Sequence, residues 1–203
     1  MSQPIASIQA ALSALGYAPG PADGLFGPRT SAAVSAWLAA GGAPARKPDA
    51  DKPELYQGAT PVREIIIHCS ATPPGWMAGR SAADKVAAIR RWHIEDRGWS
   101  DIGYHWVIDR DGTLVRGRPE TVVGAHTQGH NTGSIGICLI GGAMSSADDR
   151  FVDHYTPAQD ITLRQQIQAI SMRAQIYRVS GHNEYAQKAC PGFRVAPWLE
   201  EAS

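Results

Sequence analysis

The segment Glu64–Cys69, with the sequence EIIIHC, constrains the fold of this 203-residue chain more than any other segment. Its isoleucines place β-branched side chains on both faces, which is typical of a central strand that is buried on both sides. His68 falls near the C-terminal end of this predicted strand. Because neighbouring residues of a strand point to opposite faces, His68 and Cys69 are not expected to enter one site together.

Further helix and strand signals follow in the second half of the chain. A capping-box pattern at Ser81 begins a predicted helix that Gly98 ends. Strands are predicted at 104–109, 113–118 and 134–140, and the first two flank a hairpin turn.

A long helix is predicted to begin at Thr156, the first residue of the pattern Thr-Pro-Ala-Gln. Apolar residues at helical spacing are expected to face the core: Leu163, Ile167, Ile170, Ala174 and Tyr177. A short strand at 178–181 then leads to His182. This order of elements predicts an α/β fold class, with a mixed central β-sheet flanked by helices.

Residues 1–42 predict a small all-α module. Apolar residues recur at helical spacing from Pro4 onward: Ile5, Ile8, Leu12 and Leu15. Gly16 stands where a left-handed C-cap would end this helix. After a turn-rich stretch, a second periodic segment contains Val34, Trp37 and Leu38. We expect two helices around one ordered loop.

This module resembles the opening of the small helical peptidoglycan-binding module that is found beside many cell-wall hydrolases. The resemblance rests on Ile8-Gln9, Leu12, Leu15-Gly16-Tyr17, Asp23-Gly24, Phe26-Gly27, Thr30 and Ala33-Val34. Where a third helix is usual, the chain instead runs into Gly41-Gly42 and a Pro-rich stretch. The alternative is a helical hairpin that only packs on the main domain, since units this small rarely fold alone.

Residues 43–60 are rich in Gly, Pro and charged residues and lack periodic apolar residues. They are predicted to be a linker between the module and a catalytic domain at 61–203. Three prolines favour an extended, semi-rigid spacer: Pro44, Pro48 and Pro53.

Charge and cysteine content argue against several classes of partner. Nineteen basic residues balance nineteen acidic ones, so no global charge would hold nucleic acid or an anionic membrane. Apolar runs fall short of the ~18 residues that span a bilayer. The three cysteines are a poor disulfide framework, and the chain has no Lys or Arg before Arg29, unlike a secretory signal. We expect a monomer that is made in the cytosol, without a nucleic-acid partner or membrane insertion.

Three residues supply the protein ligands expected of a catalytic zinc site: His68, His182 and Cys190. Two imidazoles and one thiolate leave a fourth position for water. Cys190 lies in a loop where its sulfur has no obvious core to fill, whereas Cys69 and Cys138 are expected to be small apolar residues of the sheet. A His and a Cys this close in sequence also occur together by chance, so spacing alone leaves the zinc site a hypothesis.

Many separated blocks within residues 63–193 resemble the phage-type zinc N-acetylmuramoyl-L-alanine amidases, which share a fold with the peptidoglycan recognition proteins. The blocks include Ile67-His68-Cys69-Ser70-Ala71-Thr72, Gly103-Tyr104-His105, Gly124-Ala125-His126, Asn131, Ser134-Ile135-Gly136 and Lys188-Ala189-Cys190-Pro191. Residues 73–80 are an additional loop relative to the family pattern.

The resemblance implies roles for the matching residues. His68, His182 and Cys190 match the metal ligands, and the ion would polarise the scissile carbonyl and lower the pKa of bound water toward ~7. Tyr104 matches a tyrosine that orients this water or relays a proton. Lys188 matches a lysine that stabilises the oxyanion of the tetrahedral intermediate, and a solvated surface lysine is the alternative.

His126 and Asn131 are predicted substrate-binding residues. For His126 the alternative is an exposed loop histidine, and for Asn131 it is a turn-forming role before the strand at 134–140. His93 and His105 are expected to be buried in the core or to support the site.

The leading hypothesis is a two-module endolysin with Zn²⁺ as its cofactor. It would hydrolyse the amide between the lactyl group of N-acetylmuramic acid and L-alanine in peptidoglycan. A phage or prophage enzyme of this kind would accumulate in the host cytoplasm and act on the cell wall after release. Two alternatives stand beside it: a non-catalytic peptidoglycan receptor, and an amidase that also regulates an RNA polymerase.

Overall fold

The computed structural model describes residues 3–15, 17–39 and 54–201. Backbone contacts divide the chain into two units, residues 1–50 and residues 51–203. No helix within the described ranges is both long and apolar enough to cross a membrane. Gly16 and residues 43–53 of the predicted linker lie outside the described residues.

The N-terminal unit contains the two predicted helices, α1 (Gln3–Ala14) and α2 (Pro28–Ala39). The intervening loop is ordered by the amide of Gln9, which is 1% exposed. Its Nε2 lies 3.0 Å from Asp23 Oδ1, Leu25 O and Thr30 Oγ1, and its Oε1 accepts from the Gly24 N–H. The buried face therefore differs from the apolar periodicity. Ile8 and Leu38 are exposed, whereas the polar side chain of Gln9 is buried and satisfies backbone groups of the loop.

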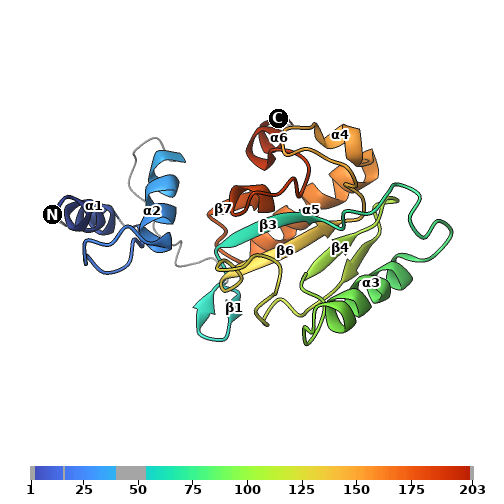
Figure 1. The fold of residues 1–203 in the computed structure, drawn as a ribbon, viewed down its shortest axis with the longest axis horizontal. Helices are drawn as coiled ribbons and strands as arrows, with labels where there is room; N and C mark the ends of the chain where they lie inside the picture. Colours follow the sequence, from blue (N-terminus) through green and yellow to red (C-terminus); the bar gives the residue numbers. More distant parts are fainter. Residues whose placement is uncertain (1–2, 16, 40–53, 202–203) are drawn as a thin grey trace. The chain divides into compact units, whose positions relative to one another are not determined.

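The C-terminal unit is built on a five-stranded mixed sheet with the order β5-β4-β6-β3-β7 (Figure 1). The strands are β3 (Glu64–Cys69), β4 (Trp106–Ile108), β5 (Leu114–Arg116), β6 (Ser134–Leu139) and β7 (Arg178–Gly181). β3 is parallel to both β6 and β7, β4 is parallel to β6, and β5 is antiparallel to β4. The predicted mixed sheet and its central strand are confirmed.

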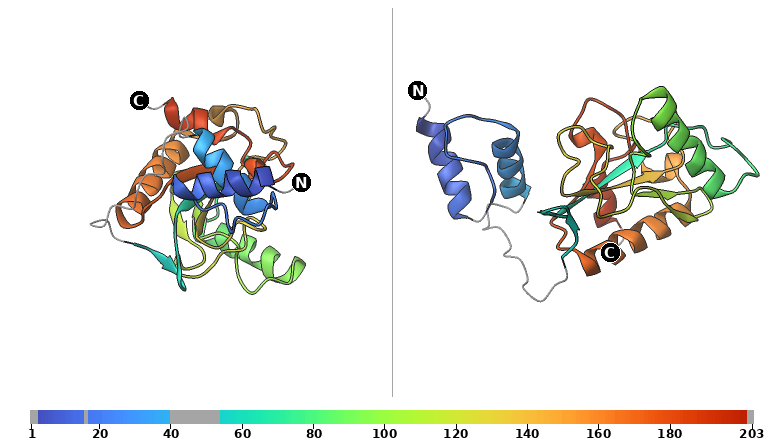
Figure 2. Two further views of the ribbon diagram at one scale, coloured as in Figure 1. Left: turned by 90° about the vertical axis from the view of Figure 1, so that its left-hand side faces the viewer. Right: turned by 90° about the horizontal axis from the view of Figure 1, so that it is seen from below.

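Helices cover both faces of this sheet, with α3 on one face and α5 on the other (Figures 1 and 2). Ser81 and Thr156 form the predicted capping boxes at the starts of α3 and α5. The helical segments are α3 (Ala82–Arg91), its π-helical continuation η1 (Trp92–Asp96), α4 (Phe151–His154), α5 (Pro157–Arg173), the 3₁₀ turn η2 (His182–Glu184) and α6 (Val195–Glu200).

The two faces of the sheet bury separate apolar cores. Ile65, Ile67 and Cys69 of β3 pack in the larger core with Leu163 and Ile170 of α5. A smaller core packs against α3 and contains Val86, Ile89, Ile102, Val107, Cys138 and Ile140.

Tyr177 was expected to face the core from the long helix, and that expectation was wrong. The helix ends at Arg173, and Ala174 already has extended backbone angles. Tyr177 is 50% exposed, and its N–H donates to the carbonyl of Arg63 as the chain enters β7. The sheet pairing overrides the helical periodicity at this point.

Residues 54–60, which were assigned to the linker, pack on the C-terminal unit instead. They contribute to a hairpin of β1 (Tyr56–Gln57) and β2 (Thr60–Pro61). Gln57 is 3% exposed, and its amide donates to Ser134 O and accepts from the Gly133 N–H, both at 2.9 Å. This hairpin satisfies backbone groups at the start of β6, which is why a segment poor in apolar periodicity is ordered here.

Candidate active site

His68 and Cys69 point to opposite faces of β3, as expected. Cys69 lies in the larger core, whereas His68 is paired in register with Cys138, which lies in the core against α3. His68 is 1% exposed. The central strand therefore places an imidazole at its C-terminal end, inside the protein.

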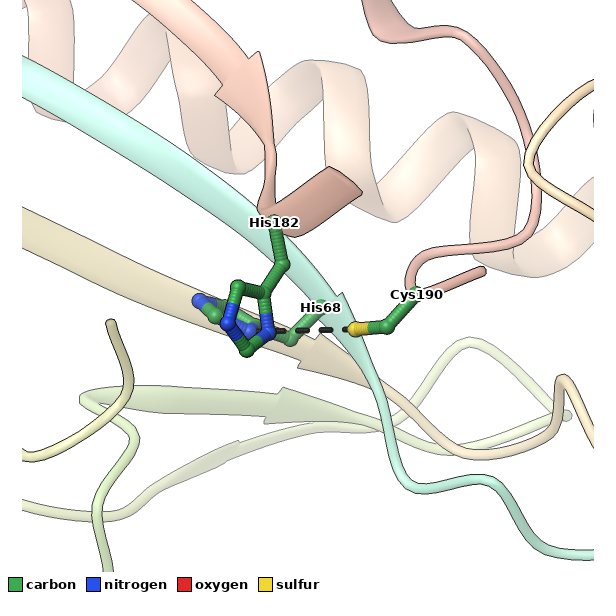
Figure 3. A group of neighbouring side chains, drawn as sticks. All are labelled: His68, His182 and Cys190. Atoms are coloured by element: carbon green, nitrogen blue, oxygen red, sulfur yellow. Dashed lines mark hydrogen bonds between the residues drawn. The ribbon is translucent and has the colours of Figure 1, made fainter. Parts of the chain in front are cut away.

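Two further potential ligands lie beside His68 (Figure 3). β7 runs parallel to β3 with Gly181 opposite Ile67, so His182 emerges next to His68, and their ring centroids are 4.7 Å apart. Cys190 comes from the loop after η2, and its Sγ is 3.8 Å from His68 Nδ1. One ligand atom from each of His68, His182 and Cys190 lies within 4.8 Å of the others.

The protonation of these groups suits a metal ion such as zinc. Burial, together with His126, His182 and Lys188, keeps the pKa of His68 well below its ordinary value. Burial and the charge of Lys188 lower the pKa of His182 to about 4. Both imidazoles are thus neutral near pH 7, which is the form that binds a metal. With one thiol, they form a nitrogen and sulfur donor set that fits zinc.

The thiol of Cys190 contacts Cys69 as well as His68. The backbone N–H of Cys69 donates to Cys190 Sγ at 3.2 Å. A hydrogen bond with the Cys69 thiol and burial raise the pKa of Cys190. Binding of a metal at Cys190 must therefore displace a proton. All three cysteines are free thiols, and Cys138 is fully buried.

Tyr104 lies against the same cluster, just before β4. Its ring centroid is 5.2 Å from that of His68 and 5.4 Å from that of His93. Burial, with a smaller contribution from nearby cysteines, raises the pKa of Tyr104 well above 10. Its hydroxyl therefore stays protonated and is able to donate a hydrogen bond, while its ring lies beside His68.

Lys188 is exposed, and it lines an open hollow of about 940 Å³. The other lining residues are Ser145, Ser146, Ala147, Asn183, Glu184, Tyr185, Ala186, Gln187 and Ala189. Its charge is among the causes that lower the pKa of both His68 and His182. The Lys188 ammonium thus acts on both imidazoles of the cluster, and Lys188 itself lines the hollow.

His126 is 7% exposed, so the alternative of an exposed loop histidine is wrong. Its Nδ1 lies 3.1 Å from His68 Nε2. Asn131 Oδ1 accepts from the N–H groups of His126 and Thr127, both at 2.8 Å, which is the turn-forming role. His126 thus contacts the cluster through His68 Nε2. Asn131 stabilises the loop that contains His126.

Thr127 and Ser134 also belong to this cluster, although the sequence did not single them out. Thr127 Oγ1 is 3.3 Å from His68 Nε2, and Ser134 Oγ is 3.4 Å from His126 Nε2. Both residues are buried. Hydroxyl residues are common throughout the chain, and the only signal was for Ser134, which stands in a block that resembles the family; Thr127 lies outside these blocks.

His93 and His105 are buried, as expected. His93 Nδ1 accepts from the Gly103 N–H at 3.0 Å, and burial, with Arg97 and Arg118, lowers the pKa of His93 to about 4. His105 Nδ1 accepts from the Gly136 N–H at 2.9 Å. Both rings support the backbone on which the cluster is built.

Comparison with known proteins assigns this site to a family. A family model described as N-acetylmuramoyl-L-alanine amidase matches residues 58–193, and one described as a putative peptidoglycan binding domain matches residues 2–39. The chain belongs to the N-acetylmuramoyl-L-alanine amidase family. This amidase is 42% identical to the endolysin of Escherichia phage T7 over 137 residues, which are 68% of the chain and 85% of that protein.

More distant relatives share the same amidase region. The chain is 30% identical to the human N-acetylmuramoyl-L-alanine amidase over 146 residues, which are 70% of the chain and 24% of that protein. Among solved structures it is similar to Drosophila PGRP-LB, with 28% identity, a TM-score of 0.55, and coverage of 75% of this chain and 82% of that one. The amidase LysC from Clostridium intestinale gives 26% identity and a TM-score of 0.55, covering 73% and 89% of the two chains. The predicted family and fold of this amidase are confirmed.

Proposed function

We propose that this amidase is zinc-dependent and acts as a phage or prophage endolysin. Its substrate would be the peptidoglycan amide between the lactyl group of N-acetylmuramic acid and L-alanine. The observation that carries the proposal is the convergence of His68, His182 and Cys190 within 4.8 Å in a chain of the amidase family. The endolysin relatives support the biological setting, in which the enzyme acts on the cell wall after release from the host cytoplasm.

The three ligands would hold the ion through two neutral imidazole nitrogens and one thiolate. When bound, zinc supplies a Lewis acid that polarises the scissile carbonyl and acidifies water. Tyr104, whose hydroxyl stays protonated, would orient the attacking water or relay a proton. Lys188 would stabilise the negative charge that develops on the carbonyl oxygen, from the side of the hollow that it lines.

Direct substrate contact by His126 and Asn131 stays a prediction. Both ring nitrogens of His126 already lie near polar partners, and Asn131 Oδ1 accepts two backbone hydrogen bonds. These contacts favour roles inside the protein over recognition of the stem peptide.

Residues 1–42 would hold the enzyme on peptidoglycan, as the match at residues 2–39 supports. The catalytic domain, expected at 61–203, would then also include residues 54–60, which contribute to the hairpin. Deletion of residues 1–50 separates the two roles. It should weaken binding to insoluble cell wall while leaving cleavage of soluble muropeptides unchanged, whereas equal wall binding would mean that the module only packs on the enzyme.

Digestion of purified peptidoglycan tests the proposed reaction. We expect new alanine amino groups without new reducing sugar ends, loss of the reaction after treatment with a chelator, and recovery on addition of zinc. New reducing ends would instead indicate a glycosidase. Tight binding of muropeptides without cleavage would indicate a receptor.

A further inference from the structure

The imidazole of His126 occupies a slot that two glycines leave open. A Cβ atom on Gly136 would lie 2.6 Å from both Cγ and Cδ2 of His126. A Cβ atom on Gly124 would lie 2.5 Å from Cδ2 of the same ring. Any larger residue at Gly124 or Gly136 would clash with the ring. The two glycines therefore leave the space that the His126 imidazole occupies next to His68.

The hydroxyl of Ser134 determines which nitrogen of His126 carries hydrogen. Ser134 Oγ lies 2.6 Å from His130 O and 3.0 Å from Asn131 O, and these carbonyl oxygens only accept. The single hydroxyl proton therefore points to one of them. Toward His126 Nε2, at 3.4 Å, Ser134 offers only a lone pair, so Nε2 must be the N–H of the neutral ring.

The same logic extends to His68. With hydrogen on Nε2, His126 has a bare Nδ1, which lies 3.1 Å from His68 Nε2. Two bare nitrogens do not form a hydrogen bond, so Nε2 of His68 must be the donor. The remaining nitrogen of His68, Nδ1, is then bare, and it is the nitrogen that lies 3.8 Å from Cys190 Sγ.

The position of the Thr127 hydroxyl is consistent with this assignment of hydrogens to Nε2 of both histidines. Its Oγ1 lies 3.3 Å from His68 Nε2 and 3.2 Å from His126 Nδ1. The hydroxyl is able to accept from His68 and donate to His126 at once. Both routes from His68 thus end on the same bare nitrogen of His126.

We propose that His126 is a positioning residue: held between the two glycines and oriented by Ser134, it fixes the tautomer of His68 so that the Nδ1 lone pair is free on the side of Cys190. The proposal rests on the proposed zinc-dependent function. The hydrogen bond behind a metal-binding histidine fixes its tautomer and orientation, and loss of such a partner typically weakens metal affinity about 10- to 100-fold.

The test combines histidine side-chain NMR with zinc titration of the ¹⁵N-labelled full chain. In the metal-free wild type, His68 should carry hydrogen on Nε2. The His126→Leu variant keeps the volume but removes the acceptor, and it should mix the His68 tautomers and weaken zinc binding about 10- to 100-fold. The His126→Asn variant restores an oxygen acceptor near the position of Nδ1 and should recover most of the affinity.

Two further variants separate this role from a general effect on folding. Ser134→Ala should allow His126 to exchange tautomers while the ring stays in its slot. His154→Gln changes a histidine that pairs with Asp149 outside the cluster, and it should match the wild type. Hydrogen on Nδ1 of His68 in the wild type, or unchanged zinc affinity in His126→Leu, would overturn the proposal. Failure of the wild type to bind zinc, with His68 in the expected tautomer, would overturn the proposed function and leave the positioning role supported.

Discussion

The backbone N–H of Cys69 donates a 3.2 Å hydrogen bond to Sγ of Cys190, 121 residues further along the chain. Cys69 thus contacts the candidate metal ligand Cys190 through its backbone as well as through its thiol, although its side chain lies in the larger core, on the opposite face of β3 from His68. An N–H donor of this kind favours the ionised form of the sulfur that it contacts. Strand β3 therefore supplies one of the three predicted ligands, His68, and its backbone stabilises a second, Cys190.

The Cys69→Ala variant should consequently retain zinc and amidase activity. The substitution leaves the backbone donor to Cys190 in place and removes only the thiol contact that raises the pKa of Cys190. Loss of a small, 7% exposed side chain should cost about 1 kcal/mol of unfolding free energy. Metal analysis and urea unfolding check both parts, and loss of zinc from this variant would show that the Cys69 thiol itself is a ligand.

Tyr104→Phe should lower kcat about 10²- to 10⁴-fold, the usual contribution of a proton-transfer group. The ring and its contact with His68 remain, so zinc content should not change. Steady-state cleavage of a soluble muropeptide measures the effect. Tyr177→Phe removes a hydroxyl from a half-exposed tyrosine on another part of the surface and serves as the matched control. Equal kcat values for the two variants would exclude a role for the Tyr104 hydroxyl.

Lys188→Met should also lower kcat, by about 10²-fold, because the carbonyl oxygen loses a cation as its negative charge develops. Lys188→Arg keeps the charge and should retain more activity. The methionine variant should still bind zinc, since Lys188 is not among the grouped ligands. If methionine leaves kcat unchanged, Lys188 is a solvated surface residue.

The stability of the metal-free protein should depend on pH through His93. The pKa of His93 is about 4 in the folded protein, against an ordinary value of 6.5. Between these values the unfolded chain binds a proton that the folded protein does not, so this contribution is complete above pH 6.5 and is lost as the pH falls toward 4. His93→Asn offers an oxygen to the Gly103 N–H but does not titrate in this range. Urea unfolding at pH 7.5 and pH 5 should show a smaller loss of stability for this variant than for the wild type, and equal losses would contradict the assignment.

Local sequence patterns predicted the parts of the fold that depend on local chemistry. The β-branched run of β3 and the capping boxes at Ser81 and Thr156 each identify an element from a few adjacent residues. Tyr177 and the hairpin at residues 56–61 could not be predicted in the same way. Their positions depend on pairing with Arg63 and with the start of β6, which are set only when the sheet assembles.

The same distinction between local chemistry and tertiary packing applies to the candidate site. His68, His182 and Cys190 were predicted because imidazole and thiolate side chains are distinctive metal ligands and because the chain resembles the amidase family, whose metal ligands these residues match. The burial of His126 and the contacts of Thr127 and Ser134 depend on the fit of one ring between two glycine backbones. Such a fit has no signature in the order of residues along the chain.

Metal analysis of the wild type beside His182→Ala and Cys190→Ala, with peptidoglycan cleavage measured on the same samples, shows whether these side chains hold a zinc ion that cleavage requires. We predict one zinc ion per wild-type chain, none in either variant, loss of amide cleavage in both, and circular dichroism spectra that show the sheet intact. Cleavage at the wild-type rate by folded, zinc-free variants would show that the amidase does not depend on zinc at this site.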